Sequence, residues 1–148
     1  KIINIAGGGA TGPRPYFSAY AASKVAIVRL TETFAKEWEQ YSIYLNAISP
    51  GAMNTRLLTD ILSAGESIGK EYQSALKQKE KGGTPTETGA GLCVYLASAE
   101  SDGISGRLIS AVWDNWQELS EHKEELADSD IYTLRRIISK DRGLNWEK

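Results

Sequence analysis

Residues that build disulfides and metal centres are scarce in this sequence. Its 148 residues include one cysteine and one histidine. Cys93 lies in an apolar run without a second cysteine to pair with, so we interpret it as a small buried hydrophobic residue and expect a reducing compartment, the cytoplasm. His122 lies in a charged stretch that is typical of a solvated helix surface. The sequence therefore predicts neither a disulfide framework nor a metal site.

Long hydrophobic runs and a strong net charge are also missing. No apolar stretch approaches the roughly 20 residues that span a bilayer, so no transmembrane helix is predicted. The 17 basic and 19 acidic residues are spread along the chain and leave a formal net charge of −2. Nucleic acid and membranes are therefore not expected as partners. The proportions of apolar and charged residues are ordinary for a globular protein.

An initiator Met is absent as well, and the first residues resemble the interior of a sheet. The run from Lys1 to Ala6 is nearly continuous in apolar, β-branched residues, which is typical of a buried parallel strand. We therefore expect that an N-terminal half precedes this chain and that any targeting segment would have been part of it.

Strand and helix signals alternate along residues 1–112. After the first strand, apolar spacing predicts a helix from Ser18, as N-cap, to about Tyr41. The elements that follow are a strand over 43–49, helical pieces over 55–83, a helix from Thr84 to about Ala99 and a strand over 107–112. Parallel strands separated by helices predict an α/β fold, namely the C-terminal part of a doubly wound, Rossmann-like sheet with about three strands and flanking helices.

A charged extension, residues 113–148, follows this predicted domain (1–112). We expect it to be helical, with short helices over 115–126 and 129–138. Its large apolar residues are interpreted as packing for the extension, with interface anchors as the alternative. They are Trp113, Trp116, Leu119 and Trp146. Arg135 and Arg136 favour a solvated helix face with salt bridges over an anion site.

The residues with catalytic potential follow the first strand. A loop rich in glycine and proline, residues 7–15, allows a ligand to approach the backbone closely. Tyr20 and Lys24 come next, and their i, i+4 spacing places a phenol and an ammonium on one face of the helix. A nearby cation favours a phenolate, which makes a phenol a better acid or base for a carbonyl/alcohol pair. Taken alone the pair is a weak signal, because this spacing also arises by chance.

Several segments together resemble the short-chain dehydrogenase/reductase family in order and spacing. They are the strand 2–5, the glycine loop and the stretches 16–24 and 45–55. The resemblance covers about residues 1–112 and is, in general, to 3-oxoacyl-acyl-carrier-protein reductase-like members, from which the extension departs. It implies that Tyr20 exchanges a proton with the substrate oxygen. It also implies that Lys24 assists this exchange and holds the nicotinamide ribose.

A nicotinamide cofactor, NAD or NADP, follows from the same resemblance. In the family, the segment that begins at Pro50-Gly51 covers the nicotinamide end of the cofactor. Backbone groups near Met53 would bind the carboxamide, and the Thr55 hydroxyl would lie near the phosphates. A strand-ending turn is the plainer interpretation of Pro50-Gly51 alone. The phosphate-binding turn and the residue that selects NAD or NADP are expected in the N-terminal half, so we expect this chain alone to be inactive.

One position departs from the family. A serine thirteen residues before the Tyr polarises the substrate carbonyl there, but that position is Gly7 here, between Ala6 and Gly8. We expect these three residues to line the substrate. None of their side chains can donate a hydrogen bond, so Thr11, Ser18 or a backbone N–H must supply the missing donor, or the rate falls.

These expectations give one leading function and two alternatives. The leading hypothesis is an NAD(P)-dependent oxidoreductase that transfers a hydride between the cofactor and a small carbonyl or secondary-alcohol substrate. Family members commonly pair through the long helix, and its apolar stripe of Val28, Phe34 and Trp38 predicts a homodimer or homotetramer. The alternatives are a catalytically weakened cofactor-binding or scaffold protein, which Gly7 favours, and a nucleotide-sugar epimerase or dehydratase.

Overall fold

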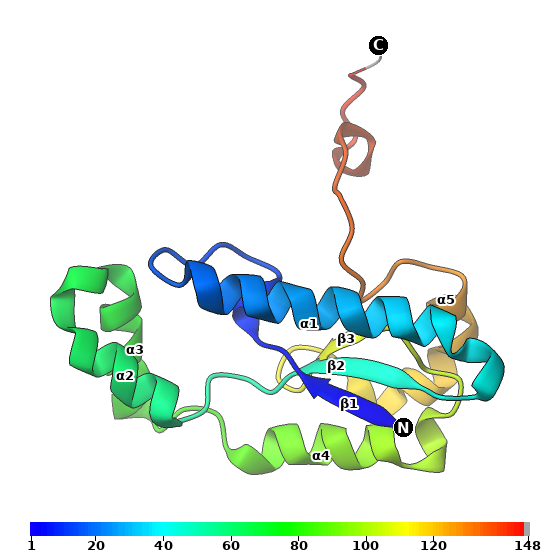
Figure 1. Ribbon diagram of the computed structural model, residues 1–148, viewed down its shortest axis with the longest axis horizontal. Helices are drawn as coiled ribbons and strands as arrows, with labels where there is room; N and C mark the ends of the chain where they lie inside the picture. The colour runs from blue at the N-terminus through cyan, green and yellow to red at the C-terminus, as the bar shows by residue number, and fades with distance from the viewer. Residues whose placement is uncertain (147–148) are drawn as a thin grey trace.

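Three short parallel strands form the sheet at the centre of residues 1–146, the part of the chain that the computed structural model describes (Figure 1). The strands β1 (Ile2–Ile5), β2 (Leu45–Ser49) and β3 (Leu108–Ser110) lie side by side in this order. Ile48 of β2 is opposite Ile5 on one side and Ile109 on the other. β2 is buried along nearly its whole length, as expected for a strand covered on both faces. The predicted parallel α/β sheet is confirmed.

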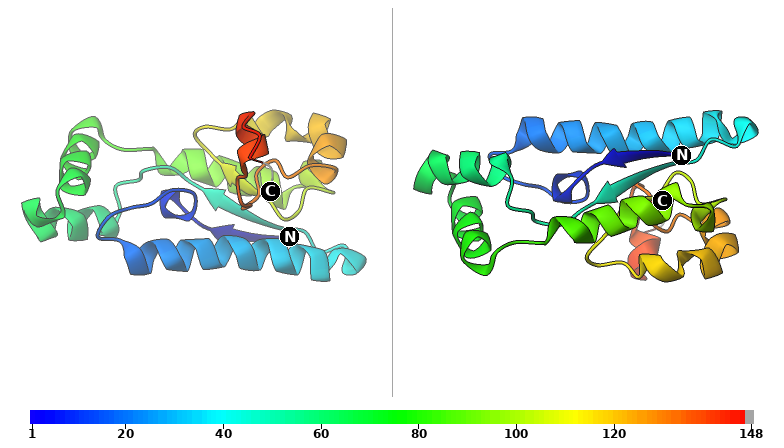
Figure 2. Two further views of the ribbon diagram at one scale, coloured as in Figure 1. Left: turned by 90° about the horizontal axis from the view of Figure 1, so that it is seen from above. Right: turned by 90° about the horizontal axis from the view of Figure 1, so that it is seen from below.

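Helices surround the sheet, and two of them cover its faces. In chain order the helices are α1 (Ser18–Glu37), α2 (Arg56–Ala64), α3 (Lys70–Lys81), α4 (Thr86–Ala97) and α5 (Lys123–Ala127). The 3-10 turns are η1 (Gly8–Ala10), η2 (Glu39–Tyr41), η3 (Gly65–Ile68), η4 (Ala99–Ser101), η5 (Trp116–His122) and η6 (Ser139–Arg142). α1 covers one face and α4 the other (Figures 1 and 2). The helices predicted over 18–41, 55–83 and 84–99 are therefore confirmed.

The helix starts differ slightly from the predicted ones. Ser18 is the first residue of α1, and Phe17 takes the N-cap position without a capping side chain. α4 starts at Thr86, because Pro85 takes the N-cap position with an extended backbone. α1 then packs on the sheet through Val28 and Thr31, which are fully buried.

Residues 56–81 form a separate helical unit beyond the carboxyl ends of the strands, at the left of Figure 1. We call it the α2–α3 unit. Leu58, Ile61 and Ala75 form its small core, and Phe17 from the loop before α1 packs against them. This core is distinct from the clusters on the two faces of the sheet.

The first part of the extension belongs to the main core. Leu119 and Leu126 are buried in one cluster with residues of α4 and β3. Trp116 packs against this cluster, with its ring centroid 5.6 Å from that of Tyr95. The helix predicted over 115–126 is found as η5 and α5, and the packing interpretation of Trp116 and Leu119 is confirmed. The predicted domain boundary after residue 112 stays a prediction.

The helix predicted over 129–138 is wrong. The backbone there is not helical and runs along the outer edge of β3, where the N–H of Leu108 donates to the carbonyl of Tyr132 at 2.8 Å. The guanidinium of buried Arg107 donates to further carbonyls of the extension. They belong to Leu126, Ser129 and Ile131. Because the sheet supplies partners for these carbonyls, the segment satisfies its backbone without another helical turn.

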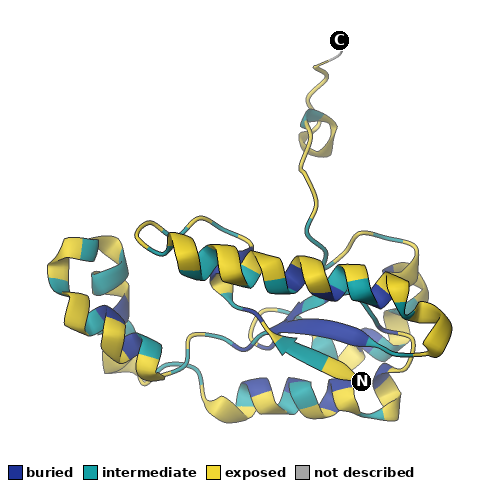
Figure 3. Cartoon of the chain, in the orientation of Figure 1, coloured by how far each residue is buried: buried dark blue, intermediate teal, exposed yellow. Residues whose placement is uncertain are grey.

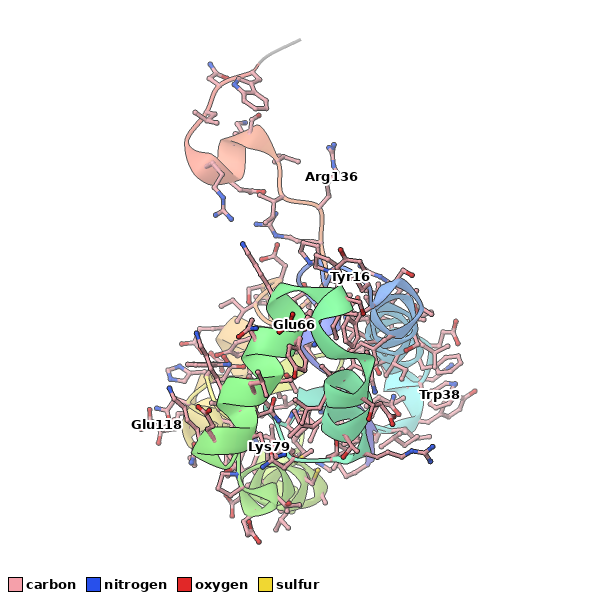
Figure 4. All side chains as sticks on the ribbon, turned by 90° about the vertical axis from the view of Figure 1, so that its left-hand side faces the viewer. Tyr16, Trp38, Glu66, Lys79, Glu118 and Arg136 are labelled. Carbon is pink, nitrogen blue, oxygen red and sulfur yellow. The ribbon has the colours of Figure 1, made fainter. Side chains whose placement is uncertain are left out.

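The extension then crosses from the α4 face to the α1 face around β3. Leu134 packs against the cluster under α1, and its N–H donates to the Glu32 carboxylate at 2.6 Å. Arg29 of α1 donates to the Leu134 carbonyl. Residues 135–146, which we call the arm, leave the body of the protein, and Arg136 stands clear of the helices (Figures 1 and 4).

Exposure on the arm and after β3 corrects two further expectations. Trp113 is 85% exposed and Trp146 is 76% exposed, so the packing interpretation is wrong for both within this chain. Most of the arm is exposed to solvent (Figure 3). Arg135 does form salt bridges, with Asp130 and Asp141, but on a non-helical segment. Residues 147 and 148, the end of the predicted extension, lie outside the described residues.

The single cysteine is half-buried and the single histidine is exposed. Cys93 is half-buried against the main core, and burial raises the pKa of its thiol. His122 is exposed, as predicted, with Nδ1 3.5 Å from the Glu125 carboxylate. Within residues 1–146, no three His, Cys, Asp or Glu side chains gather in a way that could hold a metal ion. None of the described helices is both long and apolar enough to cross a membrane.

Candidate active site

All three strands have their carboxyl ends at the same end of the sheet, which we call its carboxyl edge. The segments that follow the strands there carry the predicted site residues. Gly7 follows β1, Pro50 follows β2 and Val112 follows β3. The last two segments touch, because a Cβ added to Gly51 would lie 2.7 Å from Cγ2 of Val112. Ligands of parallel α/β sheets bind outside this edge.

Tyr20 lies in the first turn of α1, and its hydroxyl reaches the loop that follows β1. A Cβ added to Gly7 would lie 2.9 Å from Oη of Tyr20. A Cβ added to Gly9 would lie 3.2 Å from Cε1 of the same ring. The two glycines therefore allow the loop backbone to approach the phenol more closely than other residues would. Gly7, the position that departs from the family pattern, is the loop residue beside the phenol oxygen.

Lys24 lies one turn further along α1, and its ammonium is anchored at the end of β1. Its Nζ donates a hydrogen bond to the carbonyl of Ile5 at 3.0 Å. The same nitrogen lies 5.7 Å from the centroid of the Tyr20 ring. The structure thus brings together Tyr20, Lys24 and Gly7, as the i, i+4 spacing and the loop led us to expect.

A further cation, Arg14, lies near the rings of Phe17 and Tyr20. Its guanidinium carbon is 4.4 Å from the Phe17 ring centroid and 5.6 Å from that of Tyr20. Phe17 and Tyr20 meet edge to face, with centroids 6.2 Å apart. Arg14 also forms an ion pair with Glu71 of α3. The phenol of Tyr20 therefore lies among two cations, an aromatic ring and a glycine backbone.

The turn after β2 has a backbone conformation that requires glycine. Gly51 has φ +98°, and a Cβ there would lie 2.6 Å from the Thr84 hydroxyl oxygen, so glycine is required by both backbone and space. The N–H of Met53 donates to Gly51 at 3.1 Å, and the carbonyl of Met53 accepts from Gln78 at 3.0 Å. Thr55 is the N-cap residue of α2, but its exposed side chain accepts no capping hydrogen bond.

Comparison with known proteins places this arrangement in a family. The sequence model described as enoyl-(acyl carrier protein) reductase matches residues 1–111. A curated relative, 2-dehydro-3-deoxy-D-gluconate 5-dehydrogenase of Bacillus subtilis (strain 168), is 37% identical over 124 residues, which are 78% of this chain and 44% of the relative. A solved short chain dehydrogenase family protein from Francisella tularensis is 29% identical, with a TM-score of 0.61 over 74% of this chain and 48% of that one. The chain belongs to the short-chain dehydrogenase/reductase family.

Other structures of short-chain dehydrogenases/reductases match over the same region. One is 4-hydroxyisoleucine dehydrogenase complexed with NADH, which is 26% identical with a TM-score of 0.54. That match covers 74% of this chain and 43% of the other. The chain therefore spans less than half the length of the relatives that it matches.

The remaining predicted positions differ in what they offer to a ligand of a short-chain dehydrogenase/reductase. Gly8 is exposed, and a Cβ there would meet nothing within 4 Å. Ala6 is 3% exposed because its methyl group packs in the cluster under α1. Pro50 is buried, whereas the Thr55 side chain is exposed. The assignment of these residues to substrate and cofactor stays a prediction.

Two cavities among residues 1–146 of this short-chain dehydrogenase/reductase chain lie away from Tyr20. A cavity of about 880 Å³ lies between the second half of α1 and the extension, lined by Glu32, Arg107 and Asp130 among others. A smaller one of about 360 Å³ lies between the glycine loop and the arm. Neither is lined by Tyr20 or Lys24. We choose the candidate active site by its reactive groups and by the strand ends, where ligands of parallel α/β sheets bind.

Sequence reasoning missed Arg14 and Glu71. A signal for Arg14 was present, since it is the only charged residue between Ile5 and Lys24. A lone charge in a loop that precedes a candidate catalytic residue points to a partner nearby. Nothing in the sequence identified that partner as Glu71, which is 57 positions further along the chain.

Proposed function

We propose that this chain forms the catalytic part of an NAD(P)-dependent oxidoreductase that interconverts a carbonyl and a secondary alcohol in a small molecule. The observation that carries the proposal is the position of the Tyr20 hydroxyl beside Gly7 at the carboxyl edge of the sheet. In reduction, this hydroxyl donates its proton to the carbonyl oxygen of the substrate. In oxidation, the same oxygen takes the proton back.

Lys24 supports this exchange through its charge. Its ammonium lies 5.7 Å from the Tyr20 ring centroid and stabilises the negative charge that forms on the phenol oxygen as the proton leaves. An ammonium has three N–H donors, and the carbonyl of Ile5 accounts for one. The other donors are suited to bind the hydroxyls of a nicotinamide ribose at this edge.

The turn after β2 is suited to the nicotinamide end of the cofactor. The Thr55 hydroxyl is exposed at the start of α2, where a phosphate oxygen is favoured by the helix N-terminus. The backbone of Met53 already bonds within the protein, so a carboxamide that binds there shares or replaces the contact with Gly51. A bound nicotinamide supplies or accepts the hydride. The NADH complex of 4-hydroxyisoleucine dehydrogenase supports the cofactor class, and the choice between NAD and NADP stays open.

A second candidate function follows from Gly7. The loop residue nearest to the Tyr20 hydroxyl has no side chain, so the serine that usually polarises the carbonyl is absent. Removal of one such donor lowers the rate by about 10²- to 10³-fold in other enzymes. A cofactor-binding or scaffold protein with weak chemistry is therefore the alternative.

Association through α1 is also part of the proposal, with one correction. Val28, expected on the outer stripe, is fully buried against the sheet and cannot contact a partner. Leu30 is 50% exposed, and the rings of Phe34 and Trp38 stack with centroids 4.6 Å apart. We propose a homodimer or homotetramer that covers this surface. The lone, half-buried Cys93 is compatible with the cytoplasm, which stays a prediction.

A kinetic comparison of two tyrosine variants tests the function. In the full-length enzyme, we expect Tyr20→Phe to lower kcat for carbonyl reduction by about 10²-fold or more while cofactor affinity is nearly unchanged. Lys24→Ala should lower both kcat and the affinity for the cofactor. Tyr41→Phe is the matched control, because Tyr41 is 65% exposed and lies in η2, beyond the end of α1 that is far from Tyr20. If the protein binds NAD(P)H, reduces no carbonyl in a broad panel and shows the same properties after Tyr20→Phe, the scaffold function holds instead.

A further inference from the structure

The α2–α3 unit is attached to the rest of the protein at two places. Its helices pack on one another around a core of their own. The chain enters the unit through the turn after Pro50 and leaves it through Gly82 and Gly83. These connections form one attachment, the stem. The other attachment is the contact with the loop before α1, through Arg14 and Phe17.

The stem is narrow and contains three glycines with unusual backbone conformations. Gly51, Gly82 and Gly83 have φ values of +98°, +90° and +69°, which other residues rarely adopt. The two connections are tied to each other, since the N–H of Thr84 donates to the carbonyl of Ala52 at 2.8 Å. A unit with its own core and a narrow glycine-containing stem can turn as one body about that stem.

The ion pair lies far from this stem. α3 ends at Lys81 beside the stem, and Glu71 lies ten residues earlier, about 15 Å away along the helix at about 1.5 Å per residue. The side chains of Arg14 and Glu71 are 25% and 20% exposed, so water screens them less than a fully exposed pair. The contact therefore lies at the end of the α2–α3 unit that is far from the stem, where it would oppose a rotation about the stem most effectively.

The residues of the loop that form this contact, Arg14 and Phe17, also lie beside Tyr20, the proposed proton donor. The Arg14 guanidinium carbon lies 4.4 Å from the Phe17 ring centroid and 5.6 Å from that of Tyr20. Phe17 in turn packs against the core of the α2–α3 unit and meets Tyr20 edge to face. Any movement of the unit that separates Glu71 from Arg14 therefore also releases the residues that support the Tyr20 ring.

We propose that the Arg14–Glu71 ion pair is a latch that holds the α2–α3 unit against the start of α1 and so encloses the substrate side of the Tyr20 site. This inference rests on the proposed function for its kinetic consequence. Arg14 and Glu71 are positioning residues, which act through the unit and through the support of Tyr20. With the latch closed, the substrate is bound between the unit and the glycine loop. With it open, the substrate dissociates more readily.

A charge swap tests the latch in the full-length enzyme. We expect Arg14→Glu and Glu71→Arg each to raise KM for the carbonyl substrate by roughly 3- to 10-fold, with cofactor affinity unchanged. The double variant restores the ion pair with reversed polarity, so KM should return to within about twofold of the parent enzyme. A matched control is the swap Arg56→Glu with Asp60→Arg, since this pair lies on α2 with side chains 93% and 62% exposed. Neither of these substitutions, alone or together, should change KM for the carbonyl substrate.

Hydrogen exchange gives a readout that does not need activity. Backbone amides of residues 56–81 should exchange faster in each single variant and regain protection in the double variant, while amides of β2 stay unchanged. If no carbonyl is turned over but this pattern is found, the latch stands and the proposed function fails. If the enzyme is active and the exchange pattern is absent, the latch is wrong and the function stands.

Two kinetic results overturn the latch. Single variants that leave both KM and exchange unchanged would show that the pair has no influence on the unit. A double variant as impaired as Arg14→Glu would show that Arg14 acts without Glu71. If that loss is confined to carbonyl substrates that carry a carboxylate, Arg14 binds the anionic group of the substrate directly. Melting temperatures of all variants identify any that fail to fold, and Arg14→Gln, which removes the charge with a smaller change in the side chain, then replaces Arg14→Glu.

Discussion

Arg107 provides the sharpest test of how the extension is held. The residue is 9% exposed, and its guanidinium donates to the carbonyls of Ser129 at 3.0 Å, Ile131 at 2.7 Å and Leu126. Burial lowers the pKa of the guanidinium, and the charges of Glu32 and Asp130 partly offset this. An arginine remains charged in proteins, so these bonds are charge-assisted.

Arg107→Met keeps the apolar stem of the side chain and removes every donor. Three carbonyls then lose their donor. Each hydrogen bond to a charged group contributes about 1.5–3 kcal/mol, and water can replace the donor at exposed Ile131, so the unfolding free energy should fall by about 3–5 kcal/mol. At about 2–4 °C per kcal/mol for a chain of this size, Tm should fall by roughly 6–20 °C. Thermal unfolding followed by far-ultraviolet circular dichroism measures the change, and limited proteolysis shows whether residues 128–146 are released first.

Arg135→Met is the control on the same segment. Arg135 forms ion pairs with Asp130 and Asp141, but it lies on the exposed part of the extension, where such pairs are screened. Its replacement should leave Tm within about 2 °C. If Arg107→Met changed Tm as little as this control does, the extension would be held by its apolar contacts, and the role given to the guanidinium would be refuted.

Three further outcomes follow from the structure. Gly7→Ala and Gly7→Ser place the same Cβ near Tyr20, so a kcat for the serine variant about tenfold or more above that for the alanine variant isolates the hydroxyl as a carbonyl donor, and equal values contradict this role. Because burial raises the pKa of Cys93, its thiol-disulfide exchange with a chromogenic disulfide at pH 8 should be at least about tenfold slower than that of a cysteine peptide. The exchange should accelerate as the pH rises, and a rate equal to that of the peptide would contradict the burial. Trp38→Glu should convert the full-length oligomer to monomers in light scattering, and an unchanged mass would exclude the α1 surface as the interface.

Most of the fold could be predicted because it depends on local patterns. The apolar runs of β1 and β2 are bounded by turn residues, and the helical spacing after Ser18 is long enough to be distinctive. β3 was predicted over 107–112 but is shorter, Leu108–Ser110, because the chain turns at Ala111 and Val112. The N–H groups of Val112 and Trp113 donate to the Ser110 hydroxyl at that turn.

The error over 129–138 has a physical cause outside the segment. Its charged and apolar residues fit a helical face, so local spacing favoured a helix. The groups that satisfy its backbone are Glu32, which is 102 positions from Leu134, and Arg107. Local spacing contains no information about such distant partners, and tertiary contacts overrode the helical tendency.

The candidate site divides in the same way. Tyr20 and Lys24 share one helix, so their spacing alone predicts that they lie on the same face. That Gly7 lies beside the Tyr20 hydroxyl followed from the family resemblance and agrees with the geometry. The Arg14–Glu71 pair joins two segments whose relative placement depends on the stem of the α2–α3 unit and on the packing of Phe17. No spacing rule connects such segments.

The path of the extension along β3 limits how the sheet can aggregate. An open strand edge presents a row of N–H and C=O groups that any extended chain can bind. The carbonyl of Tyr132 occupies the N–H of Leu108, and the wrapped chain blocks this edge. A proline in the extension that displaces the wrapped chain from β3 should therefore open this edge to pairing between molecules and promote aggregation.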